Sequence, residues 1–156
     1  DHIDTRIKEP KSIIKKMEKK KYDKTYLNLI EKINDVAGMR IVCTLKDDIF
    51  FIRDLIKQMP DIHILKEKDY VTNPKPSGYS SYHMVVEVPV RLTQKTIYVK
   101  CEIQIRTLAM DFWASFEHKV KYKTEHNVSK KTSKELVSCA KMISKFDDKM
   151  ISLKNI

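Results

Sequence analysis

The stretch that decides the fold runs from Thr96 to Lys123 and reads TIYVKCEIQIRTLAMDFWASFEHKVKYK. Its first part alternates strictly between apolar and polar side chains, which predicts a β-strand over Thr96–Arg106 because side chains along a strand have a period of two. The polar face of this strand carries Glu102, Gln104 and Arg106 in one row. A solvated sheet face explains such a row in most strands, and the alternative is one wall of a binding site.

The residues that follow predict a helix whose polar side favours the second interpretation. Thr107 is expected to cap a helix over Leu108–Lys123. Polar side chains recur on that helix at a spacing that places them on one face, on a segment otherwise rich in aromatic residues. They are Asp111, Ser115, His118 and Tyr122. A polar strand face that leads into a polar helix face is typical of a site wall.

Composition limits the class of protein. The chain has 156 residues, which suits one domain, and a formal net charge of +10, which indicates an anionic partner such as a nucleotide, a nucleic acid or an acidic membrane surface. Its three widely spaced cysteines argue against a disulfide framework and against zinc, and predict a reducing, cytoplasmic setting. No apolar run approaches the ~20 residues of a membrane span.

The remaining elements follow from hydrophobic periodicity and from turn residues. The prediction is a lysine-rich helix from Pro10–Ser12, a short helix over about 24–33, a strand over 41–45, a helix over 47–59, and strands over 62–70 and 82–90, the last forming a hairpin with 96–106. A polar linker over 124–131 and a helix over 132–153 end the chain. This last helix has a narrow apolar stripe, which fits either a cap on the domain or contact with another subunit.

Several residues before the central strand have two interpretations each. Arg6, Lys8 and the following lysines form either a solvated basic face or a phosphate-binding surface. Asp35 is either a turn residue or a metal ligand that faces a cleft. Gly38, one of two glycines, indicates either close backbone approach or a positive φ.

The loop over 71–81 is rich in proline, glycine and serine. Pro74 and Pro76 stiffen it, and they hold Lys75 between them. Tyr79 follows Gly78, so the loop presents a cation and an aromatic ring, which suits phosphate contact and base stacking. The sequence contains no GxxxxGK[ST], no GxGxxG and no nucleophile elbow, and its histidines have no zinc-site spacing.

Taken together, five stretches resemble the synthetase domain of the RelA/SpoT family, and in particular its small single-domain alarmone synthetases. They are RIK…SI over 6–13, DVAGMR over 35–40, KDYV…NPKPSGY…SYH over 68–83, EIQIRT over 102–107 and DFWASFEHKVKYK over 111–123. The resemblance implies an α+β (mixed α/β) fold with a central mixed sheet of about five strands flanked by helices, as in nucleotidyltransferases. We assign residues 1–123 to the synthetase domain and 124–156 to the linker and C-terminal helix.

The resemblance also implies an activity, namely transfer of the β,γ-pyrophosphate of ATP to the 3′-hydroxyl of GDP or GTP with Mg²⁺, in a homotetramer. It carries over roles to matching positions. Asp35 and Glu102 match metal-binding carboxylates, and Glu102 is the candidate base for the 3′-hydroxyl. The predicted ATP-binding residues are Arg6, Lys8, Lys16 and Arg40. The predicted GDP/GTP-binding residues are Lys68, Lys75, Tyr79, His83, Gln104 and Asp111.

The chain departs from the family's usual pattern in three respects, namely Ser80, a short N-terminal helical segment and the lack of a hydrolase domain. Ser80 stands where the family often has arginine, which predicts weaker acceptor-phosphate binding or a shifted choice between GDP and GTP. No hydrolase domain accompanies the synthetase motifs, so we expect synthesis without degradation. The first alternative to this interpretation is a toxin of the same fold that pyrophosphorylates the 3′ end of tRNA, and the second is a catalytically silent nucleotide- or RNA-binding module.

Overall fold

The computed structural model describes residues 1–124 and 127–154 and contains five strands and five helices within them. In chain order the elements are β1 (His2–Ile7), α1 (Pro10–Lys19), α2 (Tyr26–Lys32), β2 (Ala37–Cys43), α3 (Lys46–Lys57), β3 (His63–Asp69), β4 (Tyr82–Arg91), β5 (Thr96–Thr107), α4 (Leu108–Lys123) and α5 (Lys130–Lys154). The predicted α+β fold with a five-stranded mixed sheet is confirmed.

The strands form one sheet in the order β1-β2-β5-β4-β3. Only the pair of β2 and β5 is parallel, and the other three pairs are antiparallel. The predicted hairpin between β4 and β5 is present, and Leu92 N donates to Lys95 O at 2.8 Å to close its turn. The alternating strand of the sequence, β5, is therefore the central strand of the sheet.

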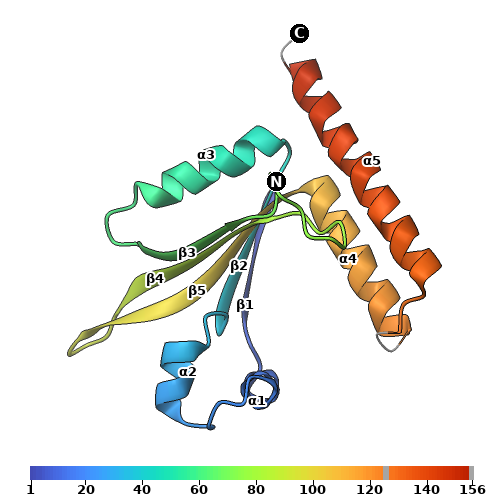
Figure 1. The fold of residues 1–156 in the computed structure, drawn as a ribbon. Coiled ribbons are helices and arrows are strands. Elements are labelled where there is room, and N and C mark those ends of the chain that lie inside the picture. The colour runs from blue at the N-terminus through green and yellow to red at the C-terminus, as the bar shows by residue number, and fades with distance from the viewer. Residues whose placement is uncertain (125–126, 155–156) are drawn as a thin grey trace.

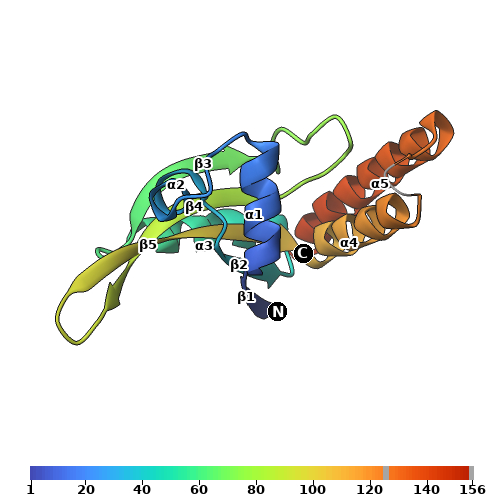
Figure 2. The same cartoon turned by 90° about the horizontal axis from the view of Figure 1, so that it is seen from below.

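Helices cover both faces of this sheet (Figure 1). Helix α3 lies on one face, and its first turn is capped by Asp48, whose Oδ2 accepts from Leu45 N at 3.0 Å. Helices α1 and α2 lie on the other face, where α1 runs across the strands (Figure 2). The main core lies under α3 and includes Ile49, Met84, Val86, Ile103 and Ile105. The apolar face of β5 is thus a core face, as its alternation predicted.

Helices α4 and α5 pack together beyond the end of β5 (Figure 1). Thr107 caps α4 as predicted, with its Oγ1 accepting from Met110 N at 3.1 Å. Trp113 of α4 is buried and donates its indole N–H to Leu136 O of α5 at 2.9 Å. The C-terminal helix therefore caps the domain. Among the helices of the described residues, none combines the length and apolar character that a bilayer span requires.

Two strand predictions were wrong at the N-terminal side. Strand β1 was not expected, because all six of its residues are exposed and an edge strand without a buried face has no alternation signal. Strand β2 begins at Ala37 rather than at Ile41, because the edge pairing with β1 extends through Gly38. The φ of Gly38 is not positive, and a Cβ atom there would lie 3.4 Å from Arg6 Cγ, at the tight end of ordinary van der Waals contact, so the structure does not require glycine at this position.

The polar stripe predicted on α4 is a site wall only at its first position. Asp111 is half-buried, whereas Ser115, His118 and Tyr122 are exposed. Phe112 and Phe116, predicted to belong to the apolar side of the helix, are also exposed and stack on each other. The helix turns these residues away from the sheet because it leaves the end of β5 and packs on α5 instead.

Candidate active site

The polar side chains of the sheet gather in two rows that cross all five strands. Residues directly opposite each other on neighbouring strands project from the same face of the sheet. The first row consists of Arg6, Gly38, Glu102, Val85 and Lys66. The second row consists of Asp4, Arg40, Gln104, His83 and Lys68. Pairing register alone therefore brings half of the twelve sequence-predicted site residues together, namely Arg6, Arg40, Lys68, His83, Glu102 and Gln104.

Asp35, which precedes β2, is held by two lysines. Its Oδ2 accepts from Lys8 Nζ at 2.9 Å and lies 2.7 Å from Lys16 Nζ. Burial raises the pKa of this carboxyl, but the hydrogen bonds and charges of Lys16 and Lys8 outweigh burial and keep the pKa below its usual value. Asp35 is therefore a carboxylate at neutral pH. Its other oxygen, Oδ1, is buried and has no hydrogen-bond partner in the described part of the chain.

Asp35 and Glu102 line one cleft of about 500 Å³. Lysines from the helix, strand and loop elements surround it, namely Lys16, Lys20, Lys32, Lys66, Lys68 and Lys75. Within residues 1–124 and 127–154, no group of three or more His, Cys, Asp or Glu side chains is arranged to hold a metal ion. A two-carboxylate site still suits Mg²⁺, which is usually bound by one or two carboxylates together with substrate phosphates.

Glu102 receives contacts at both of its carboxylate oxygens. Gln104 Nε2 donates to Oε2 at 3.2 Å, and His83 Nδ1 lies 3.5 Å from Oε1. The contact with His83 is the main cause that lowers the pKa of Glu102, and it acts against the burial that would raise it. The carboxylate is thus available as a base or as a cation ligand.

Tyr79 joins the stiff loop to this strand face. Its hydroxyl lies 2.8 Å from His83 Nε2 and accepts from Arg106 Nη2 at 2.6 Å. Lys75 Nζ lies 4.7 Å from the ring centroids of both Tyr79 and Tyr70. Lys75 therefore lines the cleft as expected, whereas the ring of Tyr79 packs beside Lys75 and is not among the residues that line the cleft.

A separate hollow of about 120 Å³ lies at the other side of Glu102, over β1 and β2. Arg6, Gly38, Arg40 and Gln104 line it with Glu102. A Cβ atom at Gly38 would lie 3.5 Å from Arg6 Nε, so Gly38 leaves room beside the Arg6 guanidinium. A groove of about 800 Å³ lined by Arg6, Lys8, Lys15, Lys16, Lys19 and Lys20 runs from there along α1.

Asp111 stands between the predicted ATP-binding and acceptor-binding residues. Its Oδ1 accepts from Arg106 Nη1 at 3.1 Å and lies 3.4 Å from Arg40 Nε. That Arg40 Nε atom is buried and makes no hydrogen bond within the described residues. Asp111, predicted to bind the guanine nucleotide, thus also contacts a residue predicted to bind ATP.

Several residues at the site were not assigned from the sequence, among them Tyr70, Arg106 and the cleft-lining Lys20, Lys32 and Lys66. Tyr70 directly follows β3 and packs its ring edge-on against Tyr79 and His83. Arg106 is 5% exposed and contacts four side chains of the site. The alternation of the central strand placed Arg106 on the same face as Glu102, and this signal could have identified it.

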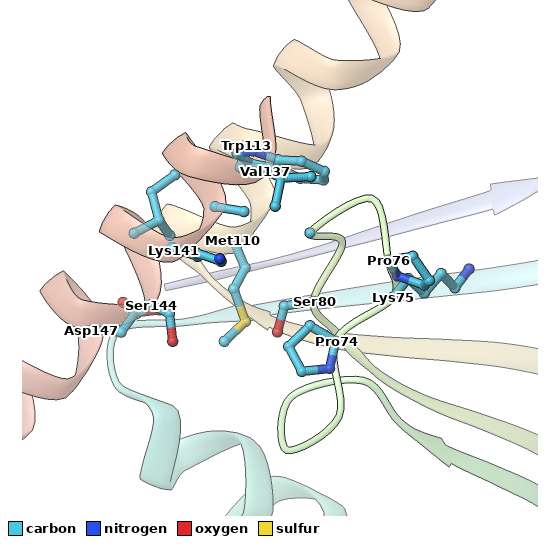
Figure 3. Close-up of a pocket in the computed structure, with 13 residues that line it drawn as sticks. Pro74, Lys75, Pro76, Ser80, Met110, Trp113, Val137, Lys141, Ser144 and Asp147 are labelled. Atoms are coloured by element: carbon cyan, nitrogen blue, oxygen red, sulfur yellow. The ribbon is translucent and has the colours of Figure 1, made fainter. Parts of the chain in front are cut away.

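An apolar cavity of about 320 Å³, distinct from the cleft, lies behind the loop that carries Lys75 and Tyr79 (Figure 3). Trp113 and Met110 from α4 and Val137 and Asp147 from α5 point into it. Gly78 has a φ of +91° and packs so tightly on α5 that a Cβ atom would lie 2.5 Å from Ala140 Cβ. Helix α5 therefore supports the back of the loop whose front faces the cleft.

Known proteins share this sequence and this fold. The family model described as the region found in RelA/SpoT proteins matches residues 5–127. Over 99% of the chain, identity is 44% to GTP pyrophosphokinase YwaC and 35% to GTP pyrophosphokinase YjbM, both of Bacillus subtilis, and the alignments cover 73% and 72% of those proteins.

Solved structures agree with the sequence comparison. The small alarmone synthetase 2 of B. subtilis superposes with a TM-score of 0.91 at 42% identity, over 99% of this chain and 81% of that one. The small alarmone synthetase 1 of B. subtilis bound to its product pppGpp gives 0.90 at 35% identity, over 99% and 78%. These matches extend over the sheet, the cleft and the flanking helices, and the chain belongs to the RelA/SpoT family, among its small alarmone synthetases.

Proposed function

We propose that the protein is a GTP pyrophosphokinase that transfers the β,γ-pyrophosphate of ATP to the 3′-hydroxyl of GDP or GTP and so makes ppGpp or pppGpp. The observation that carries this proposal is the cleft that Asp35 and Glu102 both line among lysines. A nucleotide-binding module would need cations for phosphates, but it would not need two ionised carboxylates beside them. The relatives are GTP pyrophosphokinases by name, and one solved structure contains pppGpp.

The two nucleotides are assigned to the two sides of Glu102. ATP lies on the side of Arg6 and Arg40, whose planar guanidinium groups suit the faces of a purine, and its phosphates lie along Lys8 and Lys16. The acceptor lies on the side of Lys75, Tyr79 and His83, where an aromatic ring and cations suit a guanine nucleotide. Lys68, Gln104 and Asp111 are also assigned to the acceptor, and of these Gln104 also lines the hollow beside Arg6 and Arg40 and Asp111 also contacts Arg40.

Glu102 acts on the acceptor in this scheme. It takes the proton of the 3′-hydroxyl, and the oxygen then attacks the β-phosphorus of ATP while AMP leaves. The donors at both carboxylate oxygens keep Glu102 ionised, and the surrounding lysines neutralise charge on the transferred group. Positioning and charge neutralisation supply most of the rate in phosphoryl transfers.

Asp35 and Glu102 fit a Mg²⁺ ion. The fit is supported by Asp35 Oδ1, a buried carboxylate oxygen that no group of the described residues satisfies. Both residues would supply oxygen ligands, the type that Mg²⁺ prefers. When bound, the ion would neutralise charge on the phosphates of ATP.

We further propose that the protein acts in the cytoplasm as a homo-oligomer, as the family resemblance implies. Large apolar side chains remain exposed on the outer faces of α4 and α5, and a second copy could cover them. They are Phe112, Phe116, Met142, Phe146 and Leu153. Light scattering coupled to size exclusion tests this assembly, and a monomer at micromolar concentration would contradict it.

The activity is tested by incubation with ATP, Mg²⁺ and one acceptor at a time, with products separated by anion exchange. GDP, GTP and bulk tRNA are the acceptors. We expect AMP together with a new product that is more highly charged than GDP or GTP. AMP formed only with tRNA would replace the proposal with tRNA pyrophosphorylation, and no AMP with any acceptor would leave a binding module.

A further inference from the structure

Arg106 lies at the centre of the polar network that joins Tyr79, Gln104 and Asp111. Its Nη2 donates to Tyr79 Oη and to Gln104 Oε1, each at 2.6 Å. Its Nη1 donates to Asp111 Oδ1 at 3.1 Å, and its Nε donates to Ser81 Oγ at 3.4 Å. Because the side chain is buried, these four oxygen atoms replace water as the hydrogen-bond acceptors of the guanidinium group.

A guanidinium group has donors only, and this fixes the direction of each hydrogen bond that it makes. The Tyr79 hydroxyl must accept from Arg106, so its own proton points elsewhere. The nearest partner is His83 Nε2, at 2.8 Å. In the arrangement that gives both the Tyr79 proton an acceptor and Glu102 Oε1 a donor, His83 accepts at Nε2 and carries its proton at Nδ1, the nitrogen that lies 3.5 Å from that carboxylate oxygen.

The same logic orients the Gln104 amide. Its Oε1 accepts from Arg106, so its NH₂ group points to the other side, where Nε2 donates to Glu102 Oε2 at 3.2 Å. Two short chains of hydrogen bonds thus leave Arg106 and end on the two oxygens of one carboxylate. The reversed amide would place oxygen against oxygen at Glu102 and nitrogen against nitrogen at Arg106.

We propose that Arg106 is a positioning residue that, through its donors alone, orients His83 and Gln104 so that each presents an N–H group to Glu102. Arg106 does not itself reach the reacting atoms. It holds the base between two donors on the acceptor side, and its contact with Asp111 ties this arrangement to Arg40 on the ATP side. The acceptor-side residues are consequently arranged before the guanine nucleotide binds.

The first test is the tautomer of His83 in the ligand-free protein, read from side-chain ¹⁵N shifts in long-range ¹H–¹⁵N spectra. The His83 signals are assigned by their loss in His83→Gln. We expect the form protonated at Nδ1 in the wild type and in Arg106→Lys, which keeps a side chain with donors only. In Arg106→Met we expect the form protonated at Nε2 to appear, because the Tyr79 hydroxyl is then free to accept.

Two outcomes of the spectra overturn the proposal. One is a wild-type His83 protonated at Nε2, and the other is an unchanged tautomer in a folded Arg106→Met protein. If Arg106→Met does not fold, Arg106→Gln takes its place, because its amide offers an acceptor as well as a donor and removes the fixed direction. These readouts need no substrate, so they are independent of the proposed function.

The second test is kinetic and rests on the proposed function. Arg106→Lys keeps the direction of the hydrogen bonds, but its single nitrogen cannot reach all four partners of the guanidinium. We therefore expect it to lower kcat/KM for the guanine nucleotide about 10- to 100-fold, as for other residues that orient a functional group, with a smaller change in the KM for ATP. Arg106→Lys and Tyr79→Phe interrupt the same chain of hydrogen bonds to Glu102. The fold-loss of kcat/KM in the double variant should therefore be smaller, by at least about threefold, than the product of the two single fold-losses.

Arg53→Lys is the matched control. Arg53 also pairs with a carboxylate, Asp54, and stacks on the aromatic rings of Phe50 and Tyr82, but it lies on α3 at the opposite face of the sheet. We expect wild-type kcat/KM from this variant. Additive losses in the double variant, or equal losses from Arg53→Lys, would overturn a positioning role for Arg106, whereas inactivity of the wild type would count against the proposed function alone.

Discussion

Asp35→Asn tests the charge arrangement at the centre of the cleft, because it removes one negative charge and keeps the side chain's shape. Lys8 Nζ and Lys16 Nζ lie 2.9 and 2.7 Å from the same Asp35 oxygen. The side chains of Asp35, Lys8 and Lys16 are 13%, 19% and 35% exposed. The substitution therefore leaves two neighbouring lysines facing a neutral amide.

The size of the effect follows from this partial burial. Removing one partner of a fully buried ion pair costs about 3–5 kcal/mol, and an exposed pair contributes only about 0–1 kcal/mol. Lys16 is a third exposed and is screened by water, so we expect Asp35→Asn to lower the free energy of unfolding by about 1–2 kcal/mol at pH 7.

The dependence on pH has a definite sign. The pKa of Asp35 in the folded protein is below its unfolded value of 3.8. The stabilisation is therefore fully present above that value and is lost as the pH falls through the lower, folded pKa. Asp35→Asn has no such group, so its disadvantage relative to the wild type should shrink as the pH falls below about 4.

Urea denaturation followed by circular dichroism, at pH 7 and in steps to pH 3, measures both effects. Glu18→Gln is the control, because it removes a similar 2.6 Å contact with Lys24 between two side chains that are more than half exposed. We expect the control to change the unfolding free energy by less than about 0.5 kcal/mol. An Asp35→Asn protein as stable as the wild type at pH 7, or a constant difference down to pH 3, would refute this account of Asp35.

Three further predictions concern other parts of the fold. Glu102→Gln should keep the wild-type melting temperature and lower AMP formation by about 10²–10⁴-fold, and near-normal turnover would exclude Glu102 as the base. Gly78→Ala should lower the free energy of unfolding by about 1–3 kcal/mol, because it adds a Cβ atom 2.5 Å from Ala140 Cβ at a positive φ; thermal denaturation measures this, and an unchanged melting temperature would contradict the packing. Burial raises the pKa of Asp147, so the wild type loses stability as pH rises through that pKa. Asp147→Asn should remove that loss, which urea denaturation at several pH values measures. If the free energy of unfolding of Asp147→Asn fell more steeply between pH 4 and 8 than that of the wild type, this would count against a raised pKa of Asp147.

The sequence predicted the central elements well because their signals are local. Strict alternation identified β5, and Thr107 marked the start of α4 through its own hydroxyl. Each of these features depends on only a few neighbouring residues. The alternation of apolar and polar side chains also recurs along the whole length of β5, which strengthens its signal. The family resemblance then placed Asp35 and Glu102 at one cleft, and both line it.

What the sequence did not predict depends on distant partners. Strand β1 has no buried side, and it is a strand because β2 provides an edge for pairing. The importance of Arg106 arises from Tyr79 and Asp111, which the loop and α4 bring to it. Its position on the polar face of β5 was visible in the sequence, but its hydrogen-bond partners were not.

One stretch therefore determines both the core and the chemistry, because both depend on the register of β5. Its pairings place Glu102 opposite Gly38 on one side and Val85 on the other, and Gln104 opposite Arg40 and His83. A slip of one residue would turn Glu102 and Gln104 into the core under α3 and place Ile103 in the cleft. Burying those polar groups without hydrogen-bond partners would cost free energy, and this cost opposes the slip. The hydrophobic face that stabilises the sheet therefore also keeps His83 and Gln104 beside the Glu102 carboxylate.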